Sequence, residues 1–101
     1  MGRQRYYFHA APPEARDRIA HTGLRPGSTA SYGPPAVYLF RWRTFAEDYT
    51  SRPMDVWRVD TAGLWLYPDP EDPTAAVFSE RPVGRERLRF LGTYFQGEEV
   101  P

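Results

Sequence analysis

The sequence predicts a compact α+β fold built from small, curved antiparallel sheets and short helices. The chain has 101 residues, of which 41% are hydrophobic and 16% aromatic, and this suffices for one modest core. Its segments are expected in the order β, α, β, α and then four β, which does not alternate as a doubly wound parallel sheet requires. No internal repeat or long linker interrupts the chain. We therefore expect one domain over residues 1–101, with its core at about 4–95.

The first strand and helix are predicted from an aromatic run and from capping residues. The run "RYYFH" indicates a strand over residues 4–9, on which Tyr7 and His9 share one face. A helix is expected in "PPEARDRIAHTGLRPG", because prolines suit a helix start and Gly23 suits a C-terminal cap. Leu24 is then expected to fold back onto the apolar stripe of the helix.

A loop, a buried strand and a short helix are expected next. "PGSTASYGPP", residues 26–35, is rich in Gly, Pro and Ser and is typical of a loop. "AVYLF", residues 36–40, indicates a buried strand with a central tyrosine. A helix is predicted over residues 43–51, on which Phe45 and Tyr49 lie four positions apart and face the same way.

The second half of the chain predicts strands and turns. Trp57 and Trp65 are interpreted as core residues, although a tryptophan exposed on the surface would indicate a partner site. The proline-rich acidic segment 68–74 is interpreted as a solvated turn, and the tail 96–101 is expected to fray. The four strands are expected over residues 54–60, 64–67, 75–80 and 87–95.

Composition excludes several classes of function. The 13 basic side chains, all arginine, balance 13 acidic ones, so no global basic field attracts nucleic acid. The absence of cysteine excludes disulfides and thiolate chemistry, and two histidines make a histidine-rich metal site improbable. No apolar run of membrane-spanning length and no signal peptide is found, so a cytoplasmic protein with no membrane or metal partner is expected. Phosphate-loop, dinucleotide-fold and nucleophile-elbow motifs are also missing.

An ordered set of short motifs remains. The segments "FHAAPPEARDRIAHTGLRP" and "GPPAVYLFRWRTFAEDY" place a strand-end histidine, a helix running into Gly-Leu-Arg, and a strand bearing a tyrosine in sequence, and "SERPVGRERLRFL" closes the set. In these motifs the chain resembles the ADP-ribosyltransferase-like superfamily over roughly residues 5–91. The resemblance is closest to small bacterial and phage relatives near the RNA 2′-phosphotransferases.

The resemblance implies two small sheets around a central cleft that binds NAD in a bent shape. His9 would hydrogen-bond a ribose hydroxyl through either ring nitrogen, and the main chain of Ala10 would meet the nicotinamide carboxamide. Tyr38 would line the cleft. Tyr49 would stack on the nicotinamide ring, and Phe45 is a further cofactor-binding residue. Arginine binds phosphate oxygens well, and Arg5, Arg41 and Arg43 lie beside the two expected cleft strands, so they are the candidates to hold the diphosphate.

The chain departs from the superfamily pattern in the late strand. Many such transferases carry a glutamate there, whereas Ala75 or Ala76 occupies this place in "AAVFSE". Ser79 and Glu80 are the polar residues that could assist catalysis. The sequence therefore leaves open an active transferase, which would pass ADP-ribose to a protein or nucleic-acid acceptor or to an RNA 2′-phosphate, and a catalytically inactive relative that only binds.

Ordinary structural roles compete with each of these functional ones. His9 would also suit a strand end whose ring is satisfied by hydrogen bonds, and Tyr38 and Tyr49 would also suit the core. Arg85, Arg87 and Arg89 are interpreted as a solvated face, with a phosphate or nucleic-acid patch as the alternative.

Overall fold

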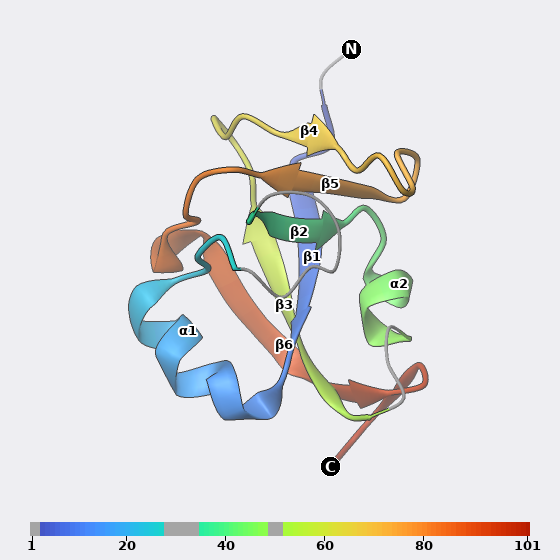
Figure 1. The fold of residues 1–101 in the computed structure, drawn as a ribbon. Helices are drawn as coiled ribbons and strands as arrows, with labels where there is room; N and C mark the ends of the chain where they lie inside the picture. The colour runs from blue at the N-terminus through green and yellow to red at the C-terminus, as the bar shows by residue number, and fades with distance from the viewer. Residues whose placement is uncertain (1–2, 28–34, 49–51) are drawn as a thin grey trace.

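The computed structural model describes residues 3–27, 35–48 and 52–101 and contains one antiparallel sheet of seven strands (Figure 1). The strands lie in the order β4-β5-β2-β1-β3-β6-β7. An α+β fold is confirmed. The helical segments are η1 (Pro13–Ala15), α1 (Arg16–Thr22), α2 (Arg43–Glu47) and η2 (Arg85–Arg87), and the strands are β1 (Tyr6–Ala11), β2 (Val37–Phe40), β3 (Met54–Asp60), β4 (Tyr67–Pro68), β5 (Ala76–Ser79), β6 (Leu88–Phe95) and β7 (Glu98–Glu99).

The expected pair of sheets is corrected to a single sheet with a weak junction. β1 pairs with β3 along its whole length, but pairs with β2 only at Phe8 and Phe40. This one pair is enough to join the two halves into one sheet. In Figure 1, β2, β5 and β4 run across the direction of β1, so the sheet bends where β1 and β2 separate.

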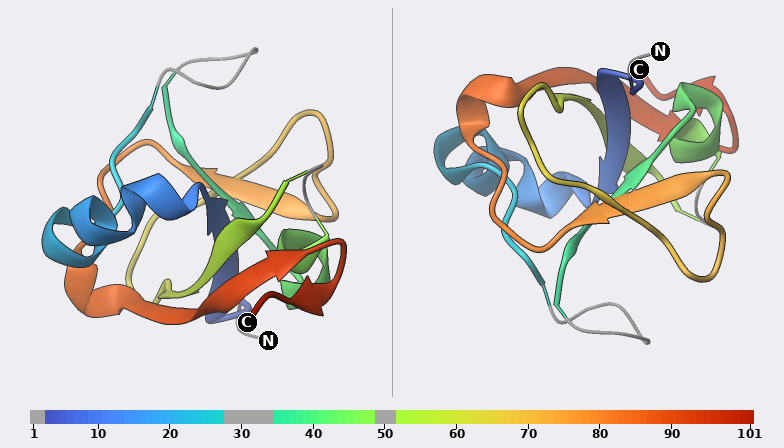
Figure 2. Two further views of the ribbon diagram at one scale, coloured as in Figure 1. Left: turned by 90° about the horizontal axis from the view of Figure 1, so that it is seen from below. Right: turned by 90° about the horizontal axis from the view of Figure 1, so that it is seen from above.

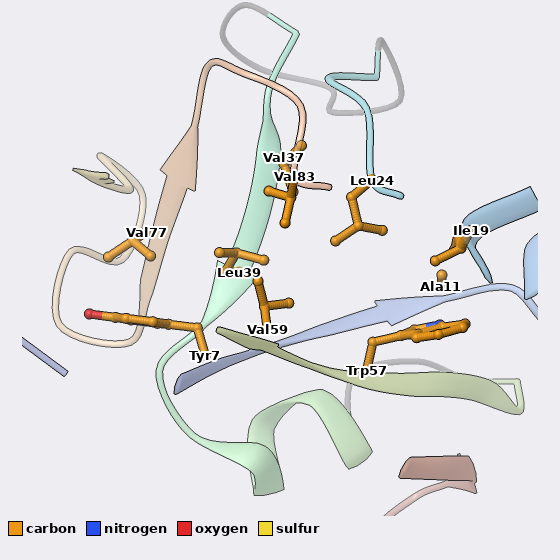
Figure 3. Packing of buried hydrophobic residues seen from close by; sticks show 10 residues of the cluster. All are labelled: Tyr7, Ala11, Ile19, Leu24, Val37, Leu39, Trp57, Val59, Val77 and Val83. Carbon is orange, nitrogen blue, oxygen red and sulfur yellow. The ribbon is translucent and has the colours of Figure 1, made fainter. Parts of the chain in front are cut away.

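The two helices cover opposite faces of the sheet, as the views in Figures 1 and 2 agree. Ile19 of α1 belongs to the larger buried cluster, which includes Tyr7 and Trp57. Figure 3 shows its ten side chains, with Tyr7 toward Val77 and Trp57 toward Ile19. Ala46 of α2 belongs to a smaller cluster on the other face. Apolar burial of this kind supplies most of the driving force for folding.

The end of α1 is locked against a distant segment. Gly23 has φ of 78° and donates its N–H to the Ile19 carbonyl, which confirms the expected glycine cap. A Cβ atom at Gly23 would lie 2.2 Å from the Val83 carbonyl oxygen, so the contact itself also requires glycine. Leu24, buried in the core, exchanges two backbone hydrogen bonds with Val83.

Two expected segments are corrected. The strand expected over 64–67 is reduced to Tyr67–Pro68, because only these residues pair with β5, and Trp65 is exposed rather than part of the core. The tail does not fray as expected, since Gln96 and Gly97, both with positive φ, form a two-residue turn that folds β7 back onto β6. Within the described residues no helix has the length and apolar character needed to cross a membrane.

A buried carboxylate anchors α1 to the sheet. Asp55 is fully buried and accepts two hydrogen bonds from Arg16, at 2.8 and 2.9 Å, and one from the Thr93 hydroxyl at 2.7 Å. Burial alone would raise the pKa of Asp55, but the bonds from Arg16 and Thr93 outweigh it and hold the pKa below its ordinary 3.8. The Arg16 guanidinium also lies over the Phe90 ring.

We predict that Asp55→Asn lowers the free energy of unfolding by about 2 kcal/mol, because the charged partner of Arg16 is lost. The depressed pKa stabilises the fold above pH 3.8 and this contribution is lost as the pH falls through the folded-state value. Urea unfolding should therefore show the gap between wild type and variant narrowing below pH 3.8. Glu14→Gln, which breaks an exposed pair with Arg52, is the control and should change little. An equal effect of the two variants would contradict the anchor.

Candidate functional site

A cleft opens beyond the junction of β1 and β2. Its volume is about 790 Å³, within the range of small-molecule sites. Its walls come from the end of β1, from α1, from the Leu24–Gly27 segment, and from β2 and β5. Most of the lining side chains are apolar. The polar or charged lining side chains among the described residues are His9, Arg18, Arg25, Tyr38 and Asp69.

His9 is held in the gap between the two strands. Its Nδ1 atom lies 2.8 Å from the Tyr38 carbonyl oxygen. Because a carbonyl only accepts, Nδ1 carries the proton and donates it, and the lone pair of the neutral ring lies on Nε2. Desolvation lowers the pKa of His9 below its ordinary 6.5, and the bond to Tyr38 only partly offsets this effect. Either ring nitrogen was expected to be able to bind a ligand. In this tautomer only Nε2 has a lone pair with which to accept a hydrogen bond.

Ala10 and Tyr38 also line the cleft. Strand alternation directs the side chains of Tyr38 and Phe40 to the face of the sheet opposite to Val37 and Leu39. All four residues line the cleft. The Tyr38 ring packs on Phe78 at a centroid distance of 5.7 Å. Three of the expected site residues, His9, Ala10 and Tyr38, are thus brought together.

Asp69 is a cleft residue that the sequence interpretation missed. The acidic segment was expected to be a solvated turn, but Asp69 is only 5% exposed. Its N–H donates to the Ala76 carbonyl at 3.0 Å, and its Oδ1 accepts the N–H of Glu71 at 2.9 Å. Ala76, one of the two residues aligned with the glutamate that the resemblance implies, lines the cleft, and Asp69 lines it from the neighbouring segment. The Asp-Pro-Glu turn was visible in the sequence, but its packing against Ala76 was not.

The arginines that line the cleft differ from those expected. Arg18 and Arg25 border it. Arg41 instead donates to the Thr74 carbonyl, and Arg43 donates to Glu47 and to the Tyr94 hydroxyl. Arg5 is paired with Asp60. The Gly-Leu-Arg motif that contains Arg25 was the signal that could have identified one of the two cleft arginines.

The other expected site residues lie elsewhere. Ser79 is buried and exchanges hydrogen bonds with the main chain of Arg81, while Glu80 is exposed just after β5. Phe45 lines a second hollow of about 650 Å³ beside α2 and packs edge-on against Trp42. Tyr49 lies outside the described residues. Across the described part of the chain, no three histidine, aspartate or glutamate side chains are grouped so that they could hold a metal ion.

We predict that the His9 ring is neutral at pH 6.5 and carries its proton on Nδ1, because the ring is desolvated and bonded to a carbonyl. Since its pKa is lower in the folded than in the unfolded chain, stability present above pH 6.5 should fall as the pH drops toward the folded-state value. Long-range ¹H–¹⁵N NMR of the imidazole measures both the tautomer and the titration. A ring protonated on Nε2, or charged at pH 6.5, would contradict the geometry.

Comparison with known proteins found no similar family, protein or structure. Its function is therefore to be inferred from the chemistry of the cleft and of the surface around it.

Proposed function

We propose that the chain binds NAD in this cleft and transfers ADP-ribose to a macromolecular acceptor or to a 2′-phosphate on RNA. The observation that carries the proposal is the meeting of His9, Tyr38 and Asp69 in one cleft although they come from distant parts of the sequence. His9 offers a hydrogen-bond acceptor at Nε2, and Asp69 offers a carboxylate. Both groups suit the hydroxyls of a ribose.

The remaining walls of the cleft are compatible with the dinucleotide. A bent NAD needs flat apolar surfaces for its rings and cations for its diphosphate. Tyr38 and Phe40 supply flat rings, and Met54 supplies a further apolar side chain. Arg18 and Arg25 supply guanidinium groups, which bind phosphate oxygens in a forked geometry. Arg41 and Arg43 are less suitable than expected because both are engaged elsewhere.

The same residues support the reaction. Breaking the bond between nicotinamide and ribose develops positive charge on the ribose, as in glycoside hydrolysis. A fixed carboxylate close to this sugar stabilises the developing charge. Asp69 is suited to this role because its Oδ1 and its main chain are held by Glu71 and Ala76. Water, a protein side chain or a phosphate would then complete the substitution.

We predict that His9→Asn weakens NAD binding about 3- to 10-fold, because the amide can still donate to the Tyr38 carbonyl but offers no equivalent of Nε2. The NAD-induced increase in melting temperature measures binding, and nicotinamide release measures turnover. His21→Ala is the matched control, since that exposed histidine lies outside the cleft lining and its Nδ1 bonds the Asp17 carbonyl of its own helix. Wild-type protein that shows neither signal would overturn the NAD proposal.

A second candidate is a relative that binds NAD without turnover. Ala76 favours it, because the β5 wall of the cleft presents a methyl group where a transferase is expected to carry glutamate. The two candidates differ in whether the Asp69 carboxylate replaces the expected glutamate in catalysis.

We predict that Asp69→Asn lowers nicotinamide release about 100-fold while it changes NAD affinity little, because charge stabilisation is exerted mainly in the transition state. Glu71→Gln changes an exposed carboxylate of the same loop and should leave release unchanged. Binding without release in the wild-type protein would favour the inactive relative. Equal release by wild type and Asp69→Asn would exclude Asp69 from catalysis.

A further inference from the structure

An exposed tryptophan ends a row of aromatic rings that begins at the cleft. The row runs through Tyr38, Phe78, Tyr67 and Trp65, with centroid distances of 5.7, 5.4 and 6.4 Å between successive rings. Strand register explains the row, because Phe78 pairs with Tyr38 on one side and with Tyr67 on the other. Trp65 is 75% exposed, and Tyr67 is 39% exposed. Core packing therefore does not account for the outer end of the row.

The turn just before Trp65 attracts three arginines. Arg3 donates to the carbonyls of Thr61 and Leu64 at 2.5 and 2.6 Å. Arg87 donates to the carbonyls of Asp60 and Ala62 at 3.1 and 2.6 Å. Arg5 forms a forked pair with the Asp60 carboxylate. Three guanidinium groups thus converge on residues 60–64, and one of them is paired with the Asp60 carboxylate.

The field at this turn is positive. The bonds from Arg5 and from the Ala62 N–H, together with the charges of Arg5 and Arg87, hold the pKa of Asp60 at about 2. Arg58 lies nearby, with its guanidinium 4.4 Å from the ring centroid of Tyr6, over which Arg5 is also placed. The net charge of the whole chain is zero, so the composition did not indicate this local excess of positive charge.

We propose that the β3–β4 turn and Trp65 form a binding platform for single-stranded nucleic acid. An unpaired base would stack on Trp65 at the open end of the aromatic row, and the adjoining phosphates would lie against Arg3, Arg5 and Arg87. Exposed aromatic rings beside basic side chains are the combination that binds single strands without reading their sequence. Arginine forks onto phosphate oxygens, and Arg3 directs only two of its five N–H donors to the turn carbonyls in the described residues.

The other exposed aromatic pair provides a contrast. Trp42 and Phe45 are each 45% exposed and contact one another. Trp42 is flanked by Arg41 and Arg43, but Arg43 is paired with Glu47, and Arg41 donates to the Thr74 carbonyl. Trp42 does not belong to the aromatic row or to the β3–β4 turn, so it serves as the control for an exposed tryptophan outside the platform.

The platform does not depend on NAD chemistry, but its use as the acceptor site rests on the proposed function. The aromatic row that leaves Trp65 ends at Tyr38, which lines the cleft. A strand held on Trp65 would thus be tethered at the surface that leads to the reacting ribose. In this case the acceptor class is nucleic acid rather than protein.

The test is binding of fluorescein-labelled 12-nucleotide dT and U oligomers, measured by anisotropy without NAD at low salt. Trp65→Ala should weaken binding about 5- to 100-fold, the range for loss of one base stack. Trp65→Phe should restore part of the affinity, and Trp42→Ala should bind like wild type. Arg3→Gln should reduce the slope of log affinity against log salt by about 0.7, the value for one phosphate contact with a single strand.

Three results would overturn the platform. The first is that the wild-type protein binds neither oligomer. The second is that Trp65→Ala and wild type bind equally well. The third is that the wild-type protein is a dimer and Trp65→Ala is not, which would assign the Trp65 ring to contact with a second copy of the chain. Because NAD is absent from the assay, oligomer binding by a protein that neither binds nor cleaves NAD would retain the platform and reject the proposed function. Stimulation of nicotinamide release by the oligomers, absent in Trp65→Ala, would support the acceptor role.

Discussion

The single pairing of Phe8 with Phe40 is the constraint on which the rest of the molecule depends. β1 keeps a full ladder with β3 on one edge, but on its other edge it pairs with β2 only at Phe8 and Phe40, because β2 runs across its direction. Backbone groups released at such a point need other partners. The His9 ring donates to the Tyr38 carbonyl there. The separation of the strands and the cleft beside it are therefore parts of one feature.

A structural and a functional role for His9 are compatible in this feature. Nδ1 of His9 satisfies the main chain of the neighbouring strand, which is a structural role. The same bond fixes the tautomer and orients the ring, so Nε2 carries the lone pair that we assign to the proposed ligand. A strand that is otherwise apolar and aromatic can thus carry an imidazole within its ladder, because Nδ1 is satisfied by the neighbouring strand.

Local patterns predicted the fold well where the deciding interactions are local. β3 has the bounds that were expected, and Gly23 caps α1 because a helix end depends on a few adjacent residues. Trp65 was misjudged because Leu64 and Leu66 on either side of it pack on the core, and a two-residue period does not say which face is buried. For the site, the sequence indicated His9, Ala10 and Tyr38. Asp69 and Arg18 were missed because the cleft joins segments that are distant in the chain.

The two outer strands carry a consequence for how this chain meets other molecules. β4 consists of two residues, one of them Pro68, which lacks an N–H, and β7 consists of the exposed Glu98 and Glu99. A short border containing proline and a short border of like charges both resist the addition of a foreign strand. The edge strands are therefore poorly suited to pair with a strand of another chain. Contacts with other molecules would then be made by exposed side chains, among which Trp42 and Trp65 are the largest apolar ones in the described residues.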